Sequence, residues 1–251
     1  MKLVGFLQIF NEDSKGNLKR CLDSMSEYCD AICVYDDAST DDSVEVALTY
    51  SKVKLIRGKV NEFGKEIYHK QELLDFANLY SPDWIFWLDA DEVIEKKGEQ
   101  GGLRELCNNA DTDACDFRQI NFWRSERYYR VDGQYNAGVF CRLWRANLPL
   151  KYDTKDGLHQ KPYPNGIHSI KTSDIKILHY GFGSSASIID KYKTYKAHGQ
   201  TGWALDRLVD ERRLLLSATD EKWLGREPVG LNGAELNAQG SIVGMMSKGL
   251  I

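Results

Sequence analysis

The sequence predicts an α/β fold with a mostly parallel, doubly wound central sheet. Short apolar runs alternate with helix-type patterns through residues 1–90. The runs are nearly continuous in apolar residues, which is typical of parallel strands buried on both faces. This alternation favours right-handed crossovers between neighbouring parallel strands. With 251 residues, of which 42% are hydrophobic, the chain can form one sizeable domain with an appendage.

Each element of the first half follows from a local pattern. Residues 3–10 form an apolar run that ends at Asn11, so we expect the first buried strand there. Leu18, Cys21, Leu22 and Met25 recur at helical spacing and predict a helix with one apolar side. Further strands are predicted at residues 31–35, 53–56 and 84–88, with helices between them that carry Val44, Ala47 and Leu48, then Leu73, Phe76, Ala77 and Tyr80.

The pattern changes after residue 95. A helix is expected near residues 102–109, and apolar or aromatic runs at 115–123, 139–144 and 175–180 predict strands of a mixed second half. A helical region follows, and from residue 217 the chain is rich in glycine and weakly periodic. We therefore expect an α/β half at residues 1–95, a second half of the same domain at 96–216, and a C-terminal extension or linker at 217–251.

Composition excludes several classes of protein. The net charge is −4 with both signs mixed, so nucleic acid is not an expected partner. The six cysteines contain no C-x-x-C pair, which favours buried free thiols in a reducing compartment. No window reaches the roughly 18 apolar residues of a membrane span. We expect no transmembrane segment and a cytoplasmic protein, with peripheral contact with a membrane left open.

Acidic and amide side chains follow three of the predicted strands, in "QIFNED", "VYDDAS" and "WLDADE". In open α/β sheets, ligands bind outside the carboxyl ends of the strands. Clustered carboxylates are costly unless a cation accompanies them, and Asp89 and Asp91 could turn toward the same hard divalent cation. Such a cation keeps positions for phosphate oxygens, so a nucleoside diphosphate is the natural partner. A solvated turn is the alternative for an isolated D-x-D.

Together, "FLQIFNED", "VYDDASTDDS" and "WIFWLDADEV" resemble the inverting glycosyltransferases of family 2 with the GT-A fold, a Rossmann-like fold of nucleotide-diphospho-sugar transferases. The order and spacing agree over residues 1–95. "RLWRANLPLKY" and "KILHYGFGS" extend the resemblance to about residue 200, in a bacterial and viral branch. The resemblance makes residues 1–95 the nucleotide-binding half and 96–216 the acceptor-binding and catalytic half.

The resemblance implies metal-dependent, inverting transfer of one sugar from a nucleotide-diphosphate sugar, expected to be UDP-linked. The acceptor would be a hydroxyl of a glycan, lipid or protein. The resemblance places the base and ribose against Gln8, Phe10, Asn11 and Asp37, with Asp36 as a neighbour that stays possible. Lys65, His69 and Lys70 are the candidates for a basic residue near the nucleotide, although a solvated helix face would explain them equally well.

The resemblance also implies a metal site for Mn²⁺ or Mg²⁺. It places Asp89 near the ribose and Asp91 on the metal, and gives His179 as a further metal ligand. Imidazole suits Mn²⁺ better than Mg²⁺, which prefers oxygen donors. Glu92 could reach the metal through water or simply begin the next element, and Glu95 is expected to be solvated.

Inverting transfer needs a base that takes the proton of the acceptor hydroxyl. In the branch that this chain resembles, an acid follows a histidine after the R-L-x-R strand, but Gln160 stands at that position. Asp156 is the nearest carboxylate and is our candidate for the base, with Asp153 and His159 as alternatives. Trp123, Tyr128, Tyr129, Tyr135 and Trp144 could stack on an acceptor sugar or simply pack in the core.

Two other functions compete with this hypothesis. A nucleotidyltransferase shares the α/β layer and the metal, but it needs a Gly-rich, basic loop after the first strand, and "NEDSKGN" is a poor version of one. A non-catalytic nucleotide- or glycan-binding module also fits, because the base is uncertain. An ATPase lacks its G-x-x-x-x-G-K-[ST] loop here. The chain ends at "MMSKGLI", which leaves open that it is part of a larger multidomain protein.

Overall fold

The computed structural model describes residues 1–132, 135, 138–154, 161–209 and 215–217. The chain forms two compact units, one of Met1–Gln119 with Val139–Ile177 and one of Ile120–Gly138 with Leu178–Ile251. The elements are β1 (Leu3–Ile9), α1 (Asn17–Tyr28), β2 (Ala31–Asp36), α2 (Ser43–Leu48), β3 (Val53–Arg57), η1 (Phe63–Lys65), α3 (Glu66–Asn78), β4 (Trp84–Trp87), β5 (Glu92–Ile94), η2 (Gly98–Gly102), α4 (Leu103–Asn109), β6 (Ala114–Asn121), β7 (Tyr128–Arg130), β8 (Val139–Arg145), β9 (Ile170–His179), α6 (Ser185–Ala197), α7 (Trp203–Val209) and β10 (Leu215–Ser217).

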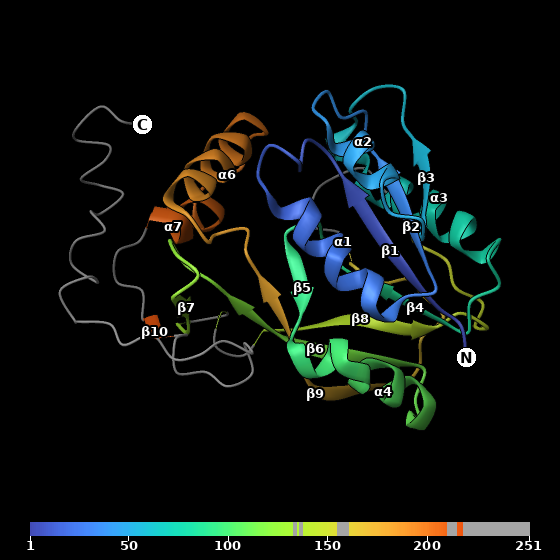
Figure 1. Ribbon diagram of the computed structural model, residues 1–251. Helices are drawn as coiled ribbons and strands as arrows, with labels where there is room; N and C mark the ends of the chain where they lie inside the picture. The colour runs from blue at the N-terminus through green and yellow to red at the C-terminus, as the bar shows by residue number, and fades with distance from the viewer. Residues whose placement is uncertain (133–134, 136–137, 155–160, 210–214, 218–251) are drawn as a thin grey trace. The chain divides into compact units, whose positions relative to one another are not determined.

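The main sheet has eight strands in the order β3-β2-β1-β4-β8-β6-β9-β5 (Figure 1). β1 pairs in parallel with β2 and β4, and β2 pairs in parallel with β3. β8 runs antiparallel to both β4 and β6. The predicted α/β fold, with a parallel first part and a mixed second half, is therefore confirmed, and it is the arrangement that the GT-A resemblance implied.

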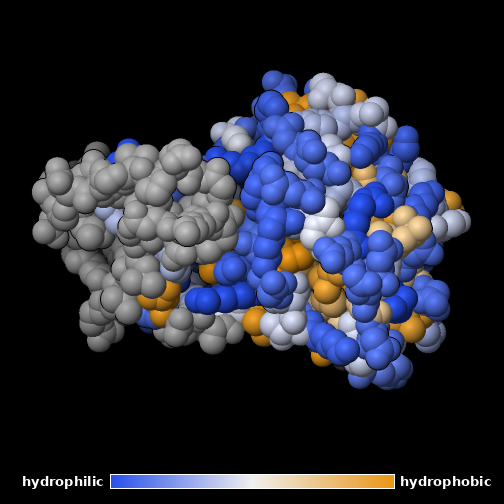
Figure 2. All heavy atoms as spheres, turned by 60° about the horizontal axis from the view of Figure 1, so that its bottom comes forward, coloured by the Kyte–Doolittle hydropathy of each residue, from blue (hydrophilic) through white to orange (hydrophobic). Residues whose placement is uncertain are grey.

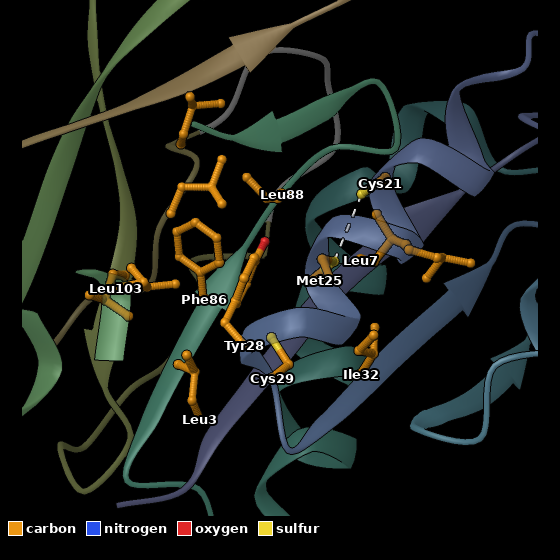
Figure 3. Packing of buried hydrophobic residues seen from close by; sticks show 14 of the residues in the cluster. Leu3, Leu7, Cys21, Met25, Tyr28, Cys29, Ile32, Phe86, Leu88 and Leu103 are labelled. Carbon is orange, nitrogen blue, oxygen red and sulfur yellow. Dashed lines mark hydrogen bonds between the residues drawn. The ribbon is translucent and has the colours of Figure 1, made fainter. Parts of the chain in front are cut away.

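Helices cover both faces of the parallel strands, because the side chains of β1 alternate between two apolar clusters. Leu3 and Leu7 pack with Met25 of α1 on one face (Figure 3). Val4 and Phe6 belong to the other cluster, which contains the buried residues of α3. Gly5 lets α1 approach closely, since a Cβ there would lie 2.5 Å from Met25 Cε. β1, β2 and β4 are thus buried on both sides, as their nearly continuous apolar runs predicted, whereas in β3 only Val53 is buried.

All six cysteines are buried free thiols, as the sequence predicted. In the first cluster, Cys21 Sγ lies 3.8 Å from Met25 Sδ (Figure 3). Burial raises the pKa of the Cys33 thiol to about 12. These thiols act as small apolar groups of the core.

The second unit has its own core. β7 and β10 pair antiparallel. Trp123, Tyr135, Phe182, Ile188 and Leu208 form a buried cluster against which residues of α6 and α7 pack. The Arg130 guanidinium lies 4.5 Å from the Trp123 ring centroid and 4.3 Å from that of Tyr135. These buried aromatic residues therefore pack within the protein.

Figure 2 shows one face on which hydrophilic residues predominate and hydrophobic residues appear in small areas. Leu79 is the most exposed of the large hydrophobic residues in the described part of the chain, at 75%. None of the helices within the described ranges combines the length and the apolar character that crossing a membrane requires.

The structure differs from the sequence prediction at β5. This three-residue strand was not predicted, and Glu95, which follows it, was expected to be solvated. That expectation was wrong: Glu95 is 1% exposed and accepts a hydrogen bond from the Lys176 backbone N–H at 2.7 Å. Its carboxylate also lies 3.6 Å from Lys97 Nζ and 3.7 Å from Lys176 Nζ. Glu95 thus ties β5 to β9. The predicted extension lies, after residue 217, outside the described residues.

Candidate active site

An acidic turn of residues 89–92 follows β4. The Glu92 backbone N–H donates to the Asp89 carbonyl at 2.9 Å, and the Asp89 backbone N–H donates to Glu92 Oε2 at 2.9 Å. Ala90 is buried, whereas Asp89 and Asp91 on either side are partly exposed. The turn therefore leaves Asp89 and Asp91 partly exposed and uses the third acid, Glu92, to close itself. That Asp89 and Asp91 face one cation stays a prediction.

Glu92 is completely buried and is held by side chains from two other strands. Arg142 of β8 donates from Nη2 to Glu92 Oε1 at 2.7 Å, and Gln119 of β6 donates to the same oxygen. Arg142 Nη2 also lies 3.1 Å from Asp89 Oδ2. Of the two roles left open for Glu92, the structure favours the beginning of the next element, because both carboxylate oxygens bond within the protein.

The Trp87 ring, at the end of β4, packs against two cations. The Arg142 guanidinium lies 3.8 Å from the ring centroid, and Lys70 Nζ lies 3.9 Å from it. Lys70 is 3% exposed and pairs with Glu66 on its own helix. Of the basic candidates on α3, Lys70 therefore packs inside the protein and does not form a solvated helix face.

Asp37, directly after β2, forms a second polar group with residues of the loop after β3 and of α3. Asn61 Nδ2 donates to Asp37 Oδ2 at 2.7 Å, and the Glu62 backbone N–H donates to Oδ1 at 3.0 Å. His69 Nδ1 lies 3.9 Å from Asp37 Oδ1, and its ring stacks on Tyr35 with the centroids 4.4 Å apart. Burial raises the pKa of Asp37, and the hydrogen bond from Glu62 offsets this only in part.

Asp36 and Asn11 hold the loops that surround this group. Asp36 is fully buried, pairs with Arg57 Nε at 2.9 Å and accepts from the Ser39 backbone N–H at 3.1 Å. Asn11 has a φ of 50° and accepts from the Thr40 backbone N–H at 2.8 Å through Oδ1. Asn11 therefore ties the loop after β1 to the loop after β2, and Asp36 ties the loop after β2 to β3. A contact of Asn11 with a nucleotide stays a prediction.

The other predicted nucleotide contacts lie at the same sheet edge or in the loop beside Asp37. Gln8 donates to the Glu66 carbonyl at 3.2 Å, and Phe10 is partly exposed directly after β1. Lys65 is exposed and pairs with Glu62, whose backbone binds Asp37. Their contacts with a nucleotide stay predictions.

Parallel pairing brings the acidic turn and the Asp37 group to one edge of the sheet. Ile9 of β1 lies opposite Asp36 of β2, and Phe6 lies opposite Trp87 of β4. Because all three strands run in the same direction, their carboxyl ends meet at this edge. The first unit thus gathers the three acidic strand ends that the sequence identified.

His179 belongs to the second unit, and its predicted metal contact stays a prediction. It is 8% exposed, and Nδ1 lies 2.8 Å from Asn121 Oδ1. An amide oxygen can only accept, so His179 Nδ1 donates in this hydrogen bond. A second bond of this kind is what metal-binding histidines commonly make.

The candidate base Asp156 lies outside the described residues, as does His159, while Asp153 is exposed. In the described ranges, no three His, Cys, Asp or Glu side chains are grouped so as to hold a metal ion by themselves.

Two residues of the site were missed by reasoning from the sequence. Arg142 had a usable signal, because an arginine within the apolar run "VFCRLWR" of a buried strand needs a carboxylate partner. Asn61 had no such signal in the sequence, since polar residues are common in loops. Its role depends on the distance to Asp37, which only the fold defines.

Comparison with known proteins identifies the family. Residues 7–166 match the model described as Glycosyl transferase family 2. The SPbeta prophage-derived glycosyltransferase SunS of Bacillus subtilis (strain 168) is 26% identical over 233 residues, which cover 87% of this chain and 47% of the relative. Glycosyltransferase SunS of Bacillus phage SPbeta matches with the same identity and coverage. The chain spans about half the length of these curated relatives.

Two solved structures also align with the chain. S. aureus TarS aligns with a TM-score of 0.49 and 14% identity, over 79% of this chain and 41% of that chain. Glucosyl-3-phosphoglycerate synthase from Mycobacterium tuberculosis, solved with Mn²⁺, uridine-diphosphate and glucosyl-3-phosphoglycerate, aligns with a TM-score of 0.37 and 17% identity, over 48% and 44%. The family model covers more than half of the chain and confirms the resemblance seen in the sequence, so the chain belongs to glycosyl transferase family 2.

Proposed function

We propose that this chain is a metal-dependent, inverting glycosyltransferase. It would move one sugar from a nucleotide-diphosphate sugar, UDP-linked, to a hydroxyl of a glycan, lipid or protein acceptor. Membership of family 2 supports glycosyl transfer. The observation that carries the proposal is that the acidic turn and Asp37 follow neighbouring parallel strands at one sheet edge.

The Asp37 group suits a nucleotide base. Asp37 already accepts from two donors, Asn61 and the backbone N–H of Glu62, which is shared between both carboxylate oxygens. Oδ1 has a second lone pair for the N–H of a base such as uracil. Tyr35 and His69 offer a stacked aromatic pair beside it. Asn61 and Glu62 orient the carboxylate, so the base would meet a fixed acceptor.

The acidic turn suits a divalent cation that is shared with a diphosphate. The resemblance to family 2 places Asp91 on the cation, and we keep this assignment. Glu92 bonds within the protein, and Asp89 is paired with Arg142. Mn²⁺ or Mg²⁺ would supply positive charge against the departing diphosphate. In our proposal Asp89 contacts the ribose, and His179 stays a predicted further ligand.

The transfer itself needs a base near the acceptor. The acceptor oxygen attacks the anomeric carbon, the bond from that carbon to the diphosphate oxygen breaks, and the nucleoside diphosphate leaves with the bonding electrons. The hydroxyl proton passes to the base, for which Asp156 is our candidate. Attack opposite the leaving group inverts the configuration of the anomeric carbon.

Two measurements test the proposal. UDP with Mn²⁺ should raise the melting temperature, because a ligand at about 100 times its Kd adds about 2.7 kcal/mol to the free energy of unfolding. Asp91→Asn should remove this shift. If no nucleoside diphosphate shifts the melting temperature with Mn²⁺ or Mg²⁺ present, the proposal is wrong.

A panel of nucleotide sugars then separates an enzyme from a binding module. Slow hydrolysis of one donor is expected from a glycosyltransferase without its acceptor, whereas a binding module leaves every donor intact. Asp156→Asn should abolish transfer and keep UDP binding, with Asp153→Asn as the matched control. Unchanged turnover of Asp156→Asn would reject Asp156 as the base.

A further inference from the structure

We infer that Arg142 is a positioning residue that acts through Asp89 to prepare the acidic turn for the nucleotide sugar. The inference rests on the proposed function, because its consequence is measured as nucleotide binding. The acidic turn carries a surplus of negative charge. Asp89, Asp91 and Glu92 place three carboxylates within four positions, and one of them is fully buried.

Arg142 is a buried cation that pairs with two of these three acids. It is 4% exposed, and its Nη2 joins Glu92 Oε1 at 2.7 Å to Asp89 Oδ2 at 3.1 Å. The two carboxylates together raise the pKa of the Arg142 guanidinium, which stays charged despite its burial. One nitrogen thus links the acid that closes the turn with the acid that faces outward.

The position of Arg142 is itself fixed. Its guanidinium packs 3.8 Å from the centroid of the Trp87 ring, two residues before Asp89 on the same strand end. Its Nε and Nη1 have no hydrogen-bond partner among the residues that the structure describes, and they belong to the guanidinium that packs on this ring. Gln119 holds Glu92 from a third strand.

Asp89 is the part of this network that can meet a substrate. Its side chain is 47% exposed, yet Oδ2 is bound to a buried cation and its backbone N–H is bound to Glu92. An exposed aspartate without these bonds would sample several rotamers, and ordering it would weaken binding. Arg142 therefore presents Asp89 in one orientation before the ligand arrives.

Lysine should not replace Arg142 in this role. A guanidinium is planar and can stack on Trp87 while it donates to the two carboxylates, whereas an ammonium is a compact and strongly hydrated charge. Charge alone would satisfy Glu92, but stacking and reach are needed to hold Asp89. Arg142→Lys therefore separates positioning from simple neutralisation.

A double-mutant cycle tests the inference by the Kd of UDP at saturating Mn²⁺, measured by isothermal titration calorimetry. Arg142→Met is made together with Glu92→Gln, so that no unpaired buried charge remains. This pair should weaken UDP binding about tenfold in the wild-type background, which is about 1.4 kcal/mol. In the Asp89→Ala background it should weaken binding less than about twofold, because the residue through which Arg142 acts is gone.

Arg145→Met is the matched control. Arg145 lies on the same strand and packs over the Trp84 ring, but it donates to the carbonyls of Ala110 and Thr112 and not to the acidic turn. It should leave the Kd of UDP unchanged. A purely structural role of Arg142 would weaken binding by the same factor in both Asp89 backgrounds, and that result would overturn the inference.

Arg142→Lys is the second variant, because it keeps the charge beside Glu92 and should fold. It should also weaken UDP binding, and the loss should again disappear with Asp89→Ala. Wild-type affinity in Arg142→Lys would show that charge alone suffices and would refute positioning. If instead the wild-type protein binds no nucleoside diphosphate, the proposed function itself is wrong. This result differs from one in which the wild-type protein binds UDP and the Arg142 variants bind it equally well.

Discussion

Replacing Arg142 by Met should destabilise the protein strongly, because it leaves the Glu92 carboxylate buried without its cation. Glu92 is 0% exposed and Arg142 is 4% exposed, so water cannot replace the lost partner at 2.7 Å. Removing one member of such a buried pair costs about 3–5 kcal/mol. For a chain of this size each kcal/mol lowers the melting temperature by about 2–4 °C, so we expect a fall of about 10 °C.

Thermal and urea unfolding, followed by circular dichroism, measure this loss. Glu92→Gln alone should also destabilise, since it leaves Arg142 buried beside a neutral partner. The double variant Arg142→Met with Glu92→Gln should lose less than the sum of the two single variants, by at least about 2 kcal/mol, because no unpaired charge remains. Arg145→Met should show no such coupling with Glu92→Gln.

Two outcomes would contradict this reasoning. A loss below about 1 kcal/mol for Arg142→Met would mean that Glu92 is solvated in the folded protein, as exposed ion pairs contribute no more than that. Additive losses for Arg142→Met and Glu92→Gln would mean that the two side chains are not partners. Either result would also remove the basis for Arg142 as a positioning residue.

Two further predictions concern the first unit. The free energy of unfolding should fall as the pH rises above about 8.5, because unfolded thiols then lose a proton that buried Cys33, with its pKa raised to about 12, retains. Between about pH 8.5 and about pH 10 this thiol accounts for about 2 kcal/mol, so Cys33→Ala should show a shallower decline in urea midpoint, and an equal decline would contradict the assignment. Gly166→Ala should cost at least about 2 kcal/mol, since φ is +96° and a Cβ would lie 2.6 Å from the Pro149 carbonyl oxygen. Gly16 has a φ of +71°, and a Cβ added there would meet no atom within 4 Å in the described ranges. Gly16→Ala should therefore lower the free energy of unfolding by about half as much as Gly166→Ala, and equal losses would rule out a clash of the new Cβ with Pro149.

The strands of the sheet could be predicted because their signal is local. Residues 84–88 are apolar throughout and residues 3–10 nearly so, and the structure buries β1 and β4 on both faces. The acidic strand ends could be placed at one edge from topology alone, since parallel strands share their direction. β5 could not be predicted in this way, because its three residues form a strand through pairing with a segment more than 70 positions away.

Glu95 shows why burial of a single charge resists local reasoning. Its neighbours Lys96 and Lys97 are exposed, and a solvated position was the simplest expectation. The fold instead brings Lys176 of β9 to it, and the backbone N–H of Lys176 donates to its carboxylate. Such partners are set by which strands become neighbours, and that choice depends on the core as a whole.

Arg142 and Glu92 each stand out in the sequence as one member of an ion pair whose partner the sequence does not identify. "WIFWLDADEVIE" holds more acids than a cation and a nucleotide need, and "VFCRLWR" places an arginine where an apolar side chain would fit. A buried charge requires an opposite charge, so each stretch predicts a partner elsewhere without identifying it. β8 supplies the match by pairing antiparallel with β4 and setting Leu143 opposite Phe86, which places Arg142 beside the strand end. Glu92, the acid in excess, therefore has a structural role, and Asp89 and Asp91 are the two acids of the turn that are partly exposed.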